Sequence, residues 1–133
     1  MELTAIKVGL KKEAVTLVAE DNTAKTLGSG SLKVFATPAM TCLMEKAAAD
    51  LLESVLSEDM TSVGISLNIA HKAPTPLGMK VRAEAVITAV DGRKVTFAVK
   101  AYDEKEEIGS GIHERFLVAA EKFQSKADSK IIK

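Results

Sequence analysis

The chain has 133 residues, of which 47% are apolar, and its 18 basic side chains balance its 18 acidic ones. This length suits one domain with a real core, and the apolar share excludes a disordered chain. The balanced charge argues against a protein dedicated to nucleic acid or to a membrane surface. The single cysteine excludes an internal disulfide and favours a reducing compartment.

The compartment and the metal content can also be predicted from composition. The first residues lack the long apolar stretch of a signal peptide, and no segment is long and apolar enough to cross a bilayer. Two histidines and one cysteine are few ligands for a metal cage. We therefore expect a cytoplasmic protein with no metal and no cofactor.

The first part of the chain predicts a strand, a loop and a long helix. Residues Glu13–Glu20 read as a short strand, and the polar, glycine-rich residues 21–33 as a mobile, lid-like loop. Apolar residues then recur at helical spacing from position 40 onward. Thr37 fits the N-cap of this helix and Pro38 its first turn. The helix should run to about Leu56 or Ser57.

After the helix the apolar period changes to two, which is typical of strands. Four strands are predicted, over residues 63–69, 81–89, 95–101 and 108–120. Asp91-Gly92 is a strong hairpin signal between the middle two. The alternation falters at Gly109–Gly111, which suggests a bulge. From about residue 124 we expect a flexible, lysine-rich and solvated tail.

The predicted order is a strand, a long helix and then four strands in an antiparallel meander. A sheet with a single helix buries the helix's apolar stripe by curling around it. We therefore predict an α+β protein with the hotdog fold, as one domain over residues 1–133. This fold leaves a sheet edge and one flank of the helix uncovered, so a homodimer is expected.

Three polar residues on these elements are candidates for chemistry. Glu45 lies on the rim of the helix's apolar stripe, where it is either a solvated surface carboxylate or a general base. His71 falls on the same strand face as Ile65, Leu67 and Ile69, so it is either a structural histidine or one that faces the helix for use. Thr37 caps the helix, and its position is also beside backbone N–H groups that can hold an oxyanion.

The last strand carries a second histidine and an arginine, His113 and Arg115. The alternative is that they form the solvated polar side of an edge strand, because the predicted bulge leaves their direction undecided. Cys42 has no neighbouring base or cation in the sequence, so we interpret it as structural. The glycine-rich segments lack the strand-to-helix context of a phosphate-binding loop.

Four segments carry a resemblance to a known family. They are VFATPAMTCLME at 34–45, TSVGISLNIAHKAPTPLGM at 61–79, VDGRKVTF at 90–97 and EIGSGIHERFLVAAEKF at 107–123. In order and spacing they resemble the hotdog thioesterases related to fluoroacetyl-CoA thioesterase. The resemblance implies hydrolysis of an acyl-CoA thioester, with the CoA belonging to the substrate.

The resemblance also implies roles for individual residues. The family's catalytic threonine, glutamate and histidine match Thr37, Glu45 and His71. Its glycine near the thioester matches Gly64, and its arginine near the substrate matches Arg115. Phe35, which precedes the catalytic threonine by two positions, is expected to contact the substrate as well. Direct attack by water and a covalent acyl-enzyme both remain open.

Thr37 and Glu45 are eight residues apart, which is ~12 Å along a helix. One chain therefore does not bring them into contact easily. Either the substrate bridges them or the site is assembled across a dimer, and we favour a site at the subunit interface.

Three departures from the family bear on the substrate. Pro38 stands where the fluoroacetyl-specific pattern has a glycine, Lys46 stands where it has an aromatic residue, and the loop TLGSGSLK at 26–33 lacks an aromatic lid. We therefore expect a small or medium acyl group and do not carry over fluoroacetyl specificity.

Two other functions compete with the thioesterase. A hotdog hydratase would show an Asp/His pair on its own motif, and the sequence has none. A non-catalytic module that binds acyl-CoA or another small ligand would be stabilised by ligand without turnover and would keep that binding after Glu45→Gln.

Overall fold

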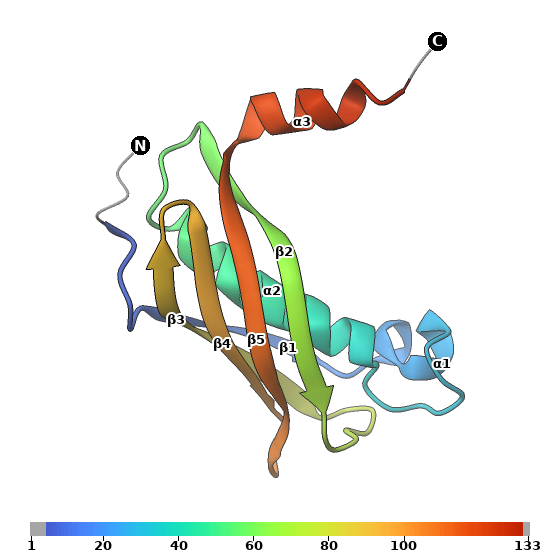
Figure 1. Cartoon of the computed structure of the whole chain (residues 1–133). Helices are drawn as coiled ribbons and strands as arrows, with labels where there is room; N and C mark the ends of the chain where they lie inside the picture. The colour runs from blue at the N-terminus through green and yellow to red at the C-terminus, as the bar shows by residue number, and fades with distance from the viewer. Residues whose placement is uncertain (1–4, 132–133) are drawn as a thin grey trace.

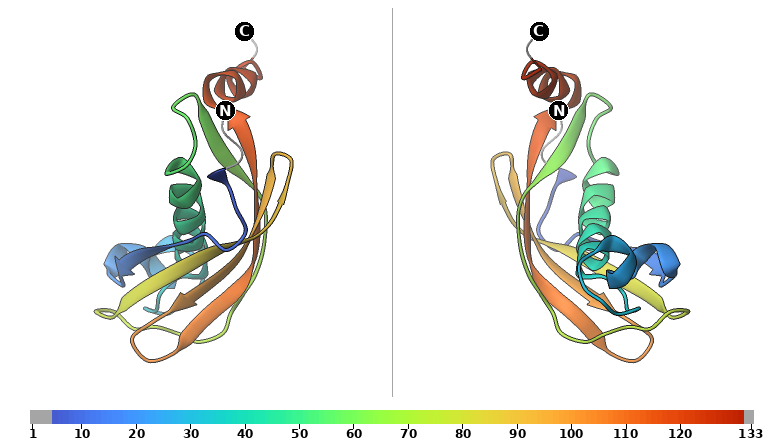
Figure 2. Two further views of the ribbon diagram at one scale, coloured as in Figure 1. Left: turned by 90° about the vertical axis from the view of Figure 1, so that its left-hand side faces the viewer. Right: turned by 90° about the vertical axis from the view of Figure 1, so that its right-hand side faces the viewer.

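The computed structural model describes residues 5–131, which form a five-stranded antiparallel sheet wrapped around one long helix (Figure 1). The strands are β1 (Lys11–Leu17), β2 (Met60–His71), β3 (Lys80–Asp91), β4 (Lys94–Tyr102) and β5 (Glu107–Ala119). The helices are η2 (Glu20–Asn22), α1 (Ala24–Leu27), α2 (Thr37–Glu53) and α3 (Ala120–Asp128). Side views show α2 on the concave side of the sheet (Figure 2). This is the predicted α+β arrangement.

Helix α2 buries the predicted apolar stripe against the sheet. Its buried residues are Met40, Leu43, Met44, Ala47, Ala48, Leu51 and Leu52. The prediction that Thr37 is the N-cap is wrong: Ala36, in extended conformation, is the N-cap, and Thr37 is the first helical residue. The helix also ends earlier than Leu56, because Ser54 caps it and donates its hydroxyl to the Leu51 carbonyl.

The strand order is β1-β3-β4-β5-β2, so the prediction of a four-strand meander is wrong for its first strand. β3, β4 and β5 follow one another as predicted, with Gly92 in left-handed conformation at the β3–β4 turn. β2 instead pairs with β5, from Met60 opposite Ala119 to His71 opposite Gly109. β2 is therefore an edge strand, and it places His71 and Gly64 beside the last strand.

A one-residue bulge at Ile65 reverses which residues of β2 face the helix. Before it, Met60 and Ser62 are buried, and after it Leu67, Ile69 and His71 are the partly buried residues. The predicted face was therefore wrong at Val63 and at Ile65, and Ile65 is 51% exposed. The bulge predicted at Gly109–Gly111 lies close by, since β4 and β5 lose register between Gly109 and Glu107.

Two segments predicted to be irregular contain helix. The lid-like loop 21–33 holds α1, whose N-cap Thr23 accepts from the Thr26 N–H. The predicted tail from about 124 continues α3, a solvated helix that projects beyond the sheet (Figure 1). Its lysines, glutamate and alanines favour a helix without burying any side chain. Within the described residues, no helix is long and apolar enough to cross a membrane.

Candidate active site

The first site feature is a hydrogen-bonded pair at the start of α2. Thr37 Oγ1 lies 2.7 Å from His71 Nδ1, which joins the first residue of the helix to the last residue of β2. Because Thr37 is not the N-cap, its hydroxyl makes no capping bond. A hydroxyl beside an imidazole nitrogen is the geometry of a nucleophile and its general base.

The environment of His71 favours its neutral form. Burial lowers the pKa of His71, and the Ala73 backbone partly opposes this effect. The other ring nitrogen, Nε2, is buried and finds no hydrogen-bond partner among residues 5–131. A neutral ring can accept a proton, so His71 can act as a base at Nδ1.

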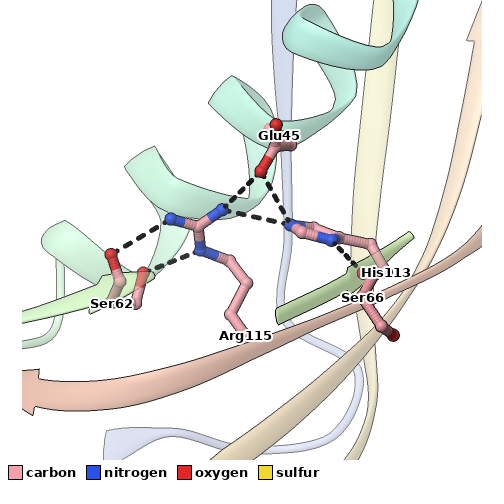
Figure 3. A network of polar contacts seen from close by, with 5 residues as sticks. All are labelled: Glu45, Ser62, Ser66, His113 and Arg115. Atoms are coloured by element: carbon pink, nitrogen blue, oxygen red, sulfur yellow. Dashed lines mark hydrogen bonds and ion pairs between the residues drawn. The ribbon is translucent and has the colours of Figure 1, made fainter. Parts of the chain in front are cut away.

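The second feature is a charged cluster around Glu45 (Figure 3). Glu45 Oε2 lies 3.5 Å from Arg115 Nη1 and 4.0 Å from His113 Nε2. His113 and Arg115 are buried, with 1% and 6% exposed, whereas the Glu45 side chain is 44% exposed. The two β5 residues therefore point inward, and the carboxylate stands between them and the surface.

Arg115 is fixed at its other end by one residue of β2. Its Nε donates to Ser62 Oγ at 2.8 Å and its Nη2 donates to the Ser62 carbonyl at 3.1 Å. Burial lowers the pKa of Arg115, while Glu45 and then Glu53 raise it. A guanidinium stays charged in a protein, so the cluster holds a buried cation facing the Glu45 carboxylate.

Gly64 lies directly against this carboxylate. A Cβ at position 64 would be 2.5 Å from Glu45 Oε2 and 3.2 Å from His113 Cε1. Only glycine leaves that space to the carboxylate, so the backbone of β2 and Glu45 meet closely at this point.

Clefts adjoin both features. One of about 270 Å³ is lined by Phe35, Thr37 and His71, together with Ala24 and Ser29 of the lid-like loop. Another of about 240 Å³ lies beside Glu45, Gly64 and His113. Phe35 is buried and forms part of the wall beside Thr37.

The structure thus brings the predicted residues together in two groups. Thr37 and His71 form one, and Glu45, Gly64 and Arg115 form the other. Within residues 5–131, no hydrogen bond or ion pair joins Glu45 to Thr37 or His71. Sequence reasoning left the direction of His113 open. The signal that points to it is its spacing of two residues from Arg115, which places both side chains on the same face of β5.

A family model described as fluoroacetyl-CoA-specific thioesterase (FlK) matches residues 18–121, a range that contains all of these residues. The chain belongs to this family. A fluoroacetyl-CoA thioesterase from Streptantibioticus cattleyicolor is 39% identical over 98 residues, which are 74% of this chain and 70% of that protein.

Two solved structures are also similar. A variant of FlK in complex with fluoroacetate and CoA is 33% identical, with a TM-score of 0.83, and the match covers 89% of this chain and 99% of that one. A hot-dog-like protein from Thermanaerovibrio acidaminovorans is 25% identical, with a TM-score of 0.89, over 100% and 99% of the two chains.

These matches confirm the predicted family, the hotdog fold and the class of thioester hydrolase. The roles assigned to Thr37, Glu45, His71, Gly64, Arg115 and Phe35 stay predictions.

Proposed function

We propose that this chain hydrolyses a small or medium acyl-CoA thioester to the free acid and CoA, with Thr37, Glu45 and His71 as its catalytic residues. The observation that carries the proposal is the 2.7 Å contact between Thr37 Oγ1 and His71 Nδ1 in a member of this family. A hydroxyl held against a neutral imidazole supports this proposal, because it is the arrangement of a nucleophile and its base.

Hydrolysis of a thioester suits the side chains of Thr37, Glu45 and His71. The leaving thiolate has an ordinary pKa of about 8.5, so it departs with little help from an acid. His71 Nδ1 takes a proton from the Thr37 hydroxyl or from a water beside it, and the oxygen that results attacks the carbonyl. The chemistry uses side chains, water and substrate, with no metal or further cofactor.

Backbone N–H groups hold the oxyanion in this proposal. The first N–H groups of a helix have no partner inside the helix and carry its positive end. In α2 these include Thr37 and Ala39, since Pro38 has no N–H. Gly64, which lies against Glu45, is the second candidate for this task.

Glu45 completes the reaction by one of two routes. In the first it orients the water from which His71 takes a proton, and that water attacks the thioester. In the second it takes a proton from the water that attacks the ester on Thr37, and it returns the proton to the Thr37 oxygen as the free acid leaves. Only the second route forms a covalent acyl-enzyme. Acid quenching of a single turnover, followed by mass measurement of the intact chain, therefore distinguishes the two routes.

We further propose that the site lies near the interface of a homodimer. β2 is an edge strand with one unpaired side, which a second copy can cover. Thr37 and Glu45 stand ~12 Å apart along α2, and the Thr37–His71 pair has no contact with its own Glu45. A second copy that brings its own Glu45 to this pair completes one site from two chains.

The experiment is a free-thiol release assay over acyl-CoAs of increasing chain length. Thr37→Ala, Glu45→Gln and His71→Ala should each lower kcat at least ~100-fold, because each removes a group that transfers a proton or attacks. Thr88→Ala and Glu58→Gln, at exposed positions away from both groups, serve as matched controls. Stabilisation by acyl-CoA without turnover of any chain length would instead establish a binding protein.

Subunit mixing tests the shared site. A dimer of one Thr37→Ala chain and one Glu45→Gln chain has one intact site if each site draws on both chains. Random pairing of co-expressed chains should then restore about a quarter of wild-type activity. If all three residues act within one chain, the mixture stays inactive.

A further inference from the structure

His113 is a buried histidine that the proposed reaction does not use. It lies on the inward face of β5 and is 1% exposed. Its ring stacks on Phe97 of β4, with 6.0 Å between centroids and 28° between planes. Each ring nitrogen contacts a polar group, so the buried ring has a hydrogen-bond partner on both sides (Figure 3).

The two contacts determine where the ring carries its proton. Nδ1 is 2.9 Å from the Ser66 carbonyl oxygen, which can only accept, so Nδ1 donates. Nε2 is 3.1 Å from Arg115 Nη1, which can only donate, so Nε2 accepts. Only the neutral ring with its hydrogen on Nδ1 satisfies both.

This tautomer controls one end of the Arg115 guanidinium. Ser62 holds Nε and Nη2, on the side away from the carboxylate. Nη1 has two N–H groups, and it lies within reach of His113 Nε2 and, at 3.5 Å, of Glu45 Oε2. His113 is the acceptor that directs Nη1, and Nη1 is the atom that meets Glu45.

We propose that His113 is a positioning residue, which as its neutral Nδ1–H tautomer aims Arg115 Nη1 at Glu45 and so keeps the carboxylate against Gly64. The catalytic meaning of this inference rests on the proposed thioesterase function. His113 acts through Arg115 and touches no reacting atom.

The charges that face His113 are consistent with a neutral ring. Burial lowers its pKa, the Ser66 carbonyl opposes this, the Arg115 charge lowers it again and Glu45 raises it. Arg115 on β5 and Glu45 on α2 are the charged groups near the ring, and β2 and β4 present Ser66 and Phe97. A protonated ring would direct Nε2–H at an N–H of Arg115 and break the arrangement.

The first test is the ¹⁵N NMR spectrum of the histidine rings at neutral pH. The chain has only two histidines, so His71→Gln leaves His113 as the one signal. We expect a protonated, pyrrole-like Nδ1 and an unprotonated, pyridine-like Nε2. A ring protonated at Nε2, or at both nitrogens, would overturn the proposal.

The second test compares His113→Gln with His113→Phe. Both remove the ring Nδ1–H, but the Gln oxygen can accept from Arg115 and the Phe ring cannot. A hydrogen bond to a charged group supports a loss of kcat of about 10-fold or more for Phe, with KM changed less than threefold. Gln should recover most of that loss. Melting temperatures of both variants verify that they are folded.

The outcomes separate the two proposals. A folded His113→Phe variant with wild-type kcat, or equal losses for Phe and Gln, would overturn the positioning role while the thioesterase function stands. A wild-type chain that hydrolyses no acyl-CoA would overturn the thioesterase function and the catalytic purpose of His113 with it, whichever tautomer the spectrum shows.

Discussion

Gly64→Ala should separate activity from stability in this protein. The added Cβ would lie 2.5 Å from Glu45 Oε2 and 3.5 Å from Arg115 Nη1. Since ordinary contact begins near 3.4 Å, the carboxylate has to retreat by about 0.9 Å (3.4 − 2.5) or swing away. Position 64 itself accepts alanine, because its φ is not in the left-handed region and the residue is exposed.

The two effects have different sizes. A catalytic group misplaced by about 1 Å can cost ~100-fold in rate, so we expect kcat/KM to fall between ~10-fold and ~100-fold. Alanine in place of glycine within a strand contributes about 0.5–1 kcal/mol of stability. This offsets the weakened contact between Glu45 and Arg115, so the free energy of unfolding should stay within about 1 kcal/mol of wild type.

The assay is kcat/KM by thiol release together with urea unfolding, with Gly109→Ala as the contrasting variant. A Cβ at position 109 would meet Met40 Sδ at 2.6 Å and the Ala70 carbonyl at 2.9 Å, inside the core. That variant should lose about 1–3 kcal/mol through overpacking. Wild-type kcat/KM for Gly64→Ala would refute the placement of Glu45 or its part in the chemistry.

Three further predictions concern the cluster and its histidines. Arg115→Lys should lower kcat ~10-fold or more and lower the free energy of unfolding in urea by about 1–3 kcal/mol. A lysine lacks the planar guanidinium with which Arg115 contacts Ser62 and Glu45 at the same time. An unchanged kcat would show that Arg115 serves only the fold. Ser62→Ala should lower the free energy of unfolding by about 1 kcal/mol and lower kcat by a smaller factor than Arg115→Lys does. The reason is that Arg115 Nη2 keeps its hydrogen bond to the backbone carbonyl of residue 62. A larger loss of kcat than in Arg115→Lys would contradict this order. The folded-state pKa values of His71 and His113 lie below the unfolded value, so the unfolded chain binds more protons. The free energy of unfolding should therefore fall as the pH drops below about 6.5. Urea titrations between pH 7.5 and 5 should show a smaller fall for His113→Gln than for the wild type.

The helix and the strands on which the site is built were predictable from periodicity. The stripe from Met40 to Leu52 repeats at helical spacing because one face packs on the sheet, and that prediction is confirmed. The pairing of β2 with β5 was not predictable in this way. Alternation records which face of a strand is buried but not which strand lies beside it.

The bulge at Ile65 shows a second limit. Apolar residues alternate without a break in the sequence at Val63, Ile65, Leu67 and Ile69. One extra residue in β2 nevertheless places Val63 and Ile65 on the outer face, while Leu67 and Ile69 stay on the inner face. Gly64, directly before the bulge, was the sign of it in the sequence, because a glycine inside a strand often marks a bulge. A strand that is apolar on both sides of a bulge therefore looks regular in its sequence.

Only part of the candidate site was predictable from the sequence. Thr37, Glu45 and His71 were candidates from their positions at the helix start, on the rim of the apolar stripe and on the inner strand face. The resemblance then assigned them catalytic roles. His113 and Arg115 could not be placed, because their orientation depends on which register the last strand takes after the glycines 109–111. Once β5 is paired on both sides, the residues at 113, 115 and 117 point inward.

The carboxylate on the rim of α2 now has a physical reason. A buried guanidinium is costly unless its charge and its N–H groups are satisfied, and Ser62 and His113 supply acceptors but no charge. Glu45 supplies the charge, and its own side chain is 44% exposed. Arg115 and His113 therefore contact the carboxylate from the buried side, and under the proposed function Glu45 acts on substrate from its exposed side. Thr37 lies about two turns from Glu45 on α2, and His71 of β2 is paired with Thr37. If Glu45 acts together with this pair, as proposed, then substrate or a second chain joins the two groups, and the subunit-mixing experiment decides which.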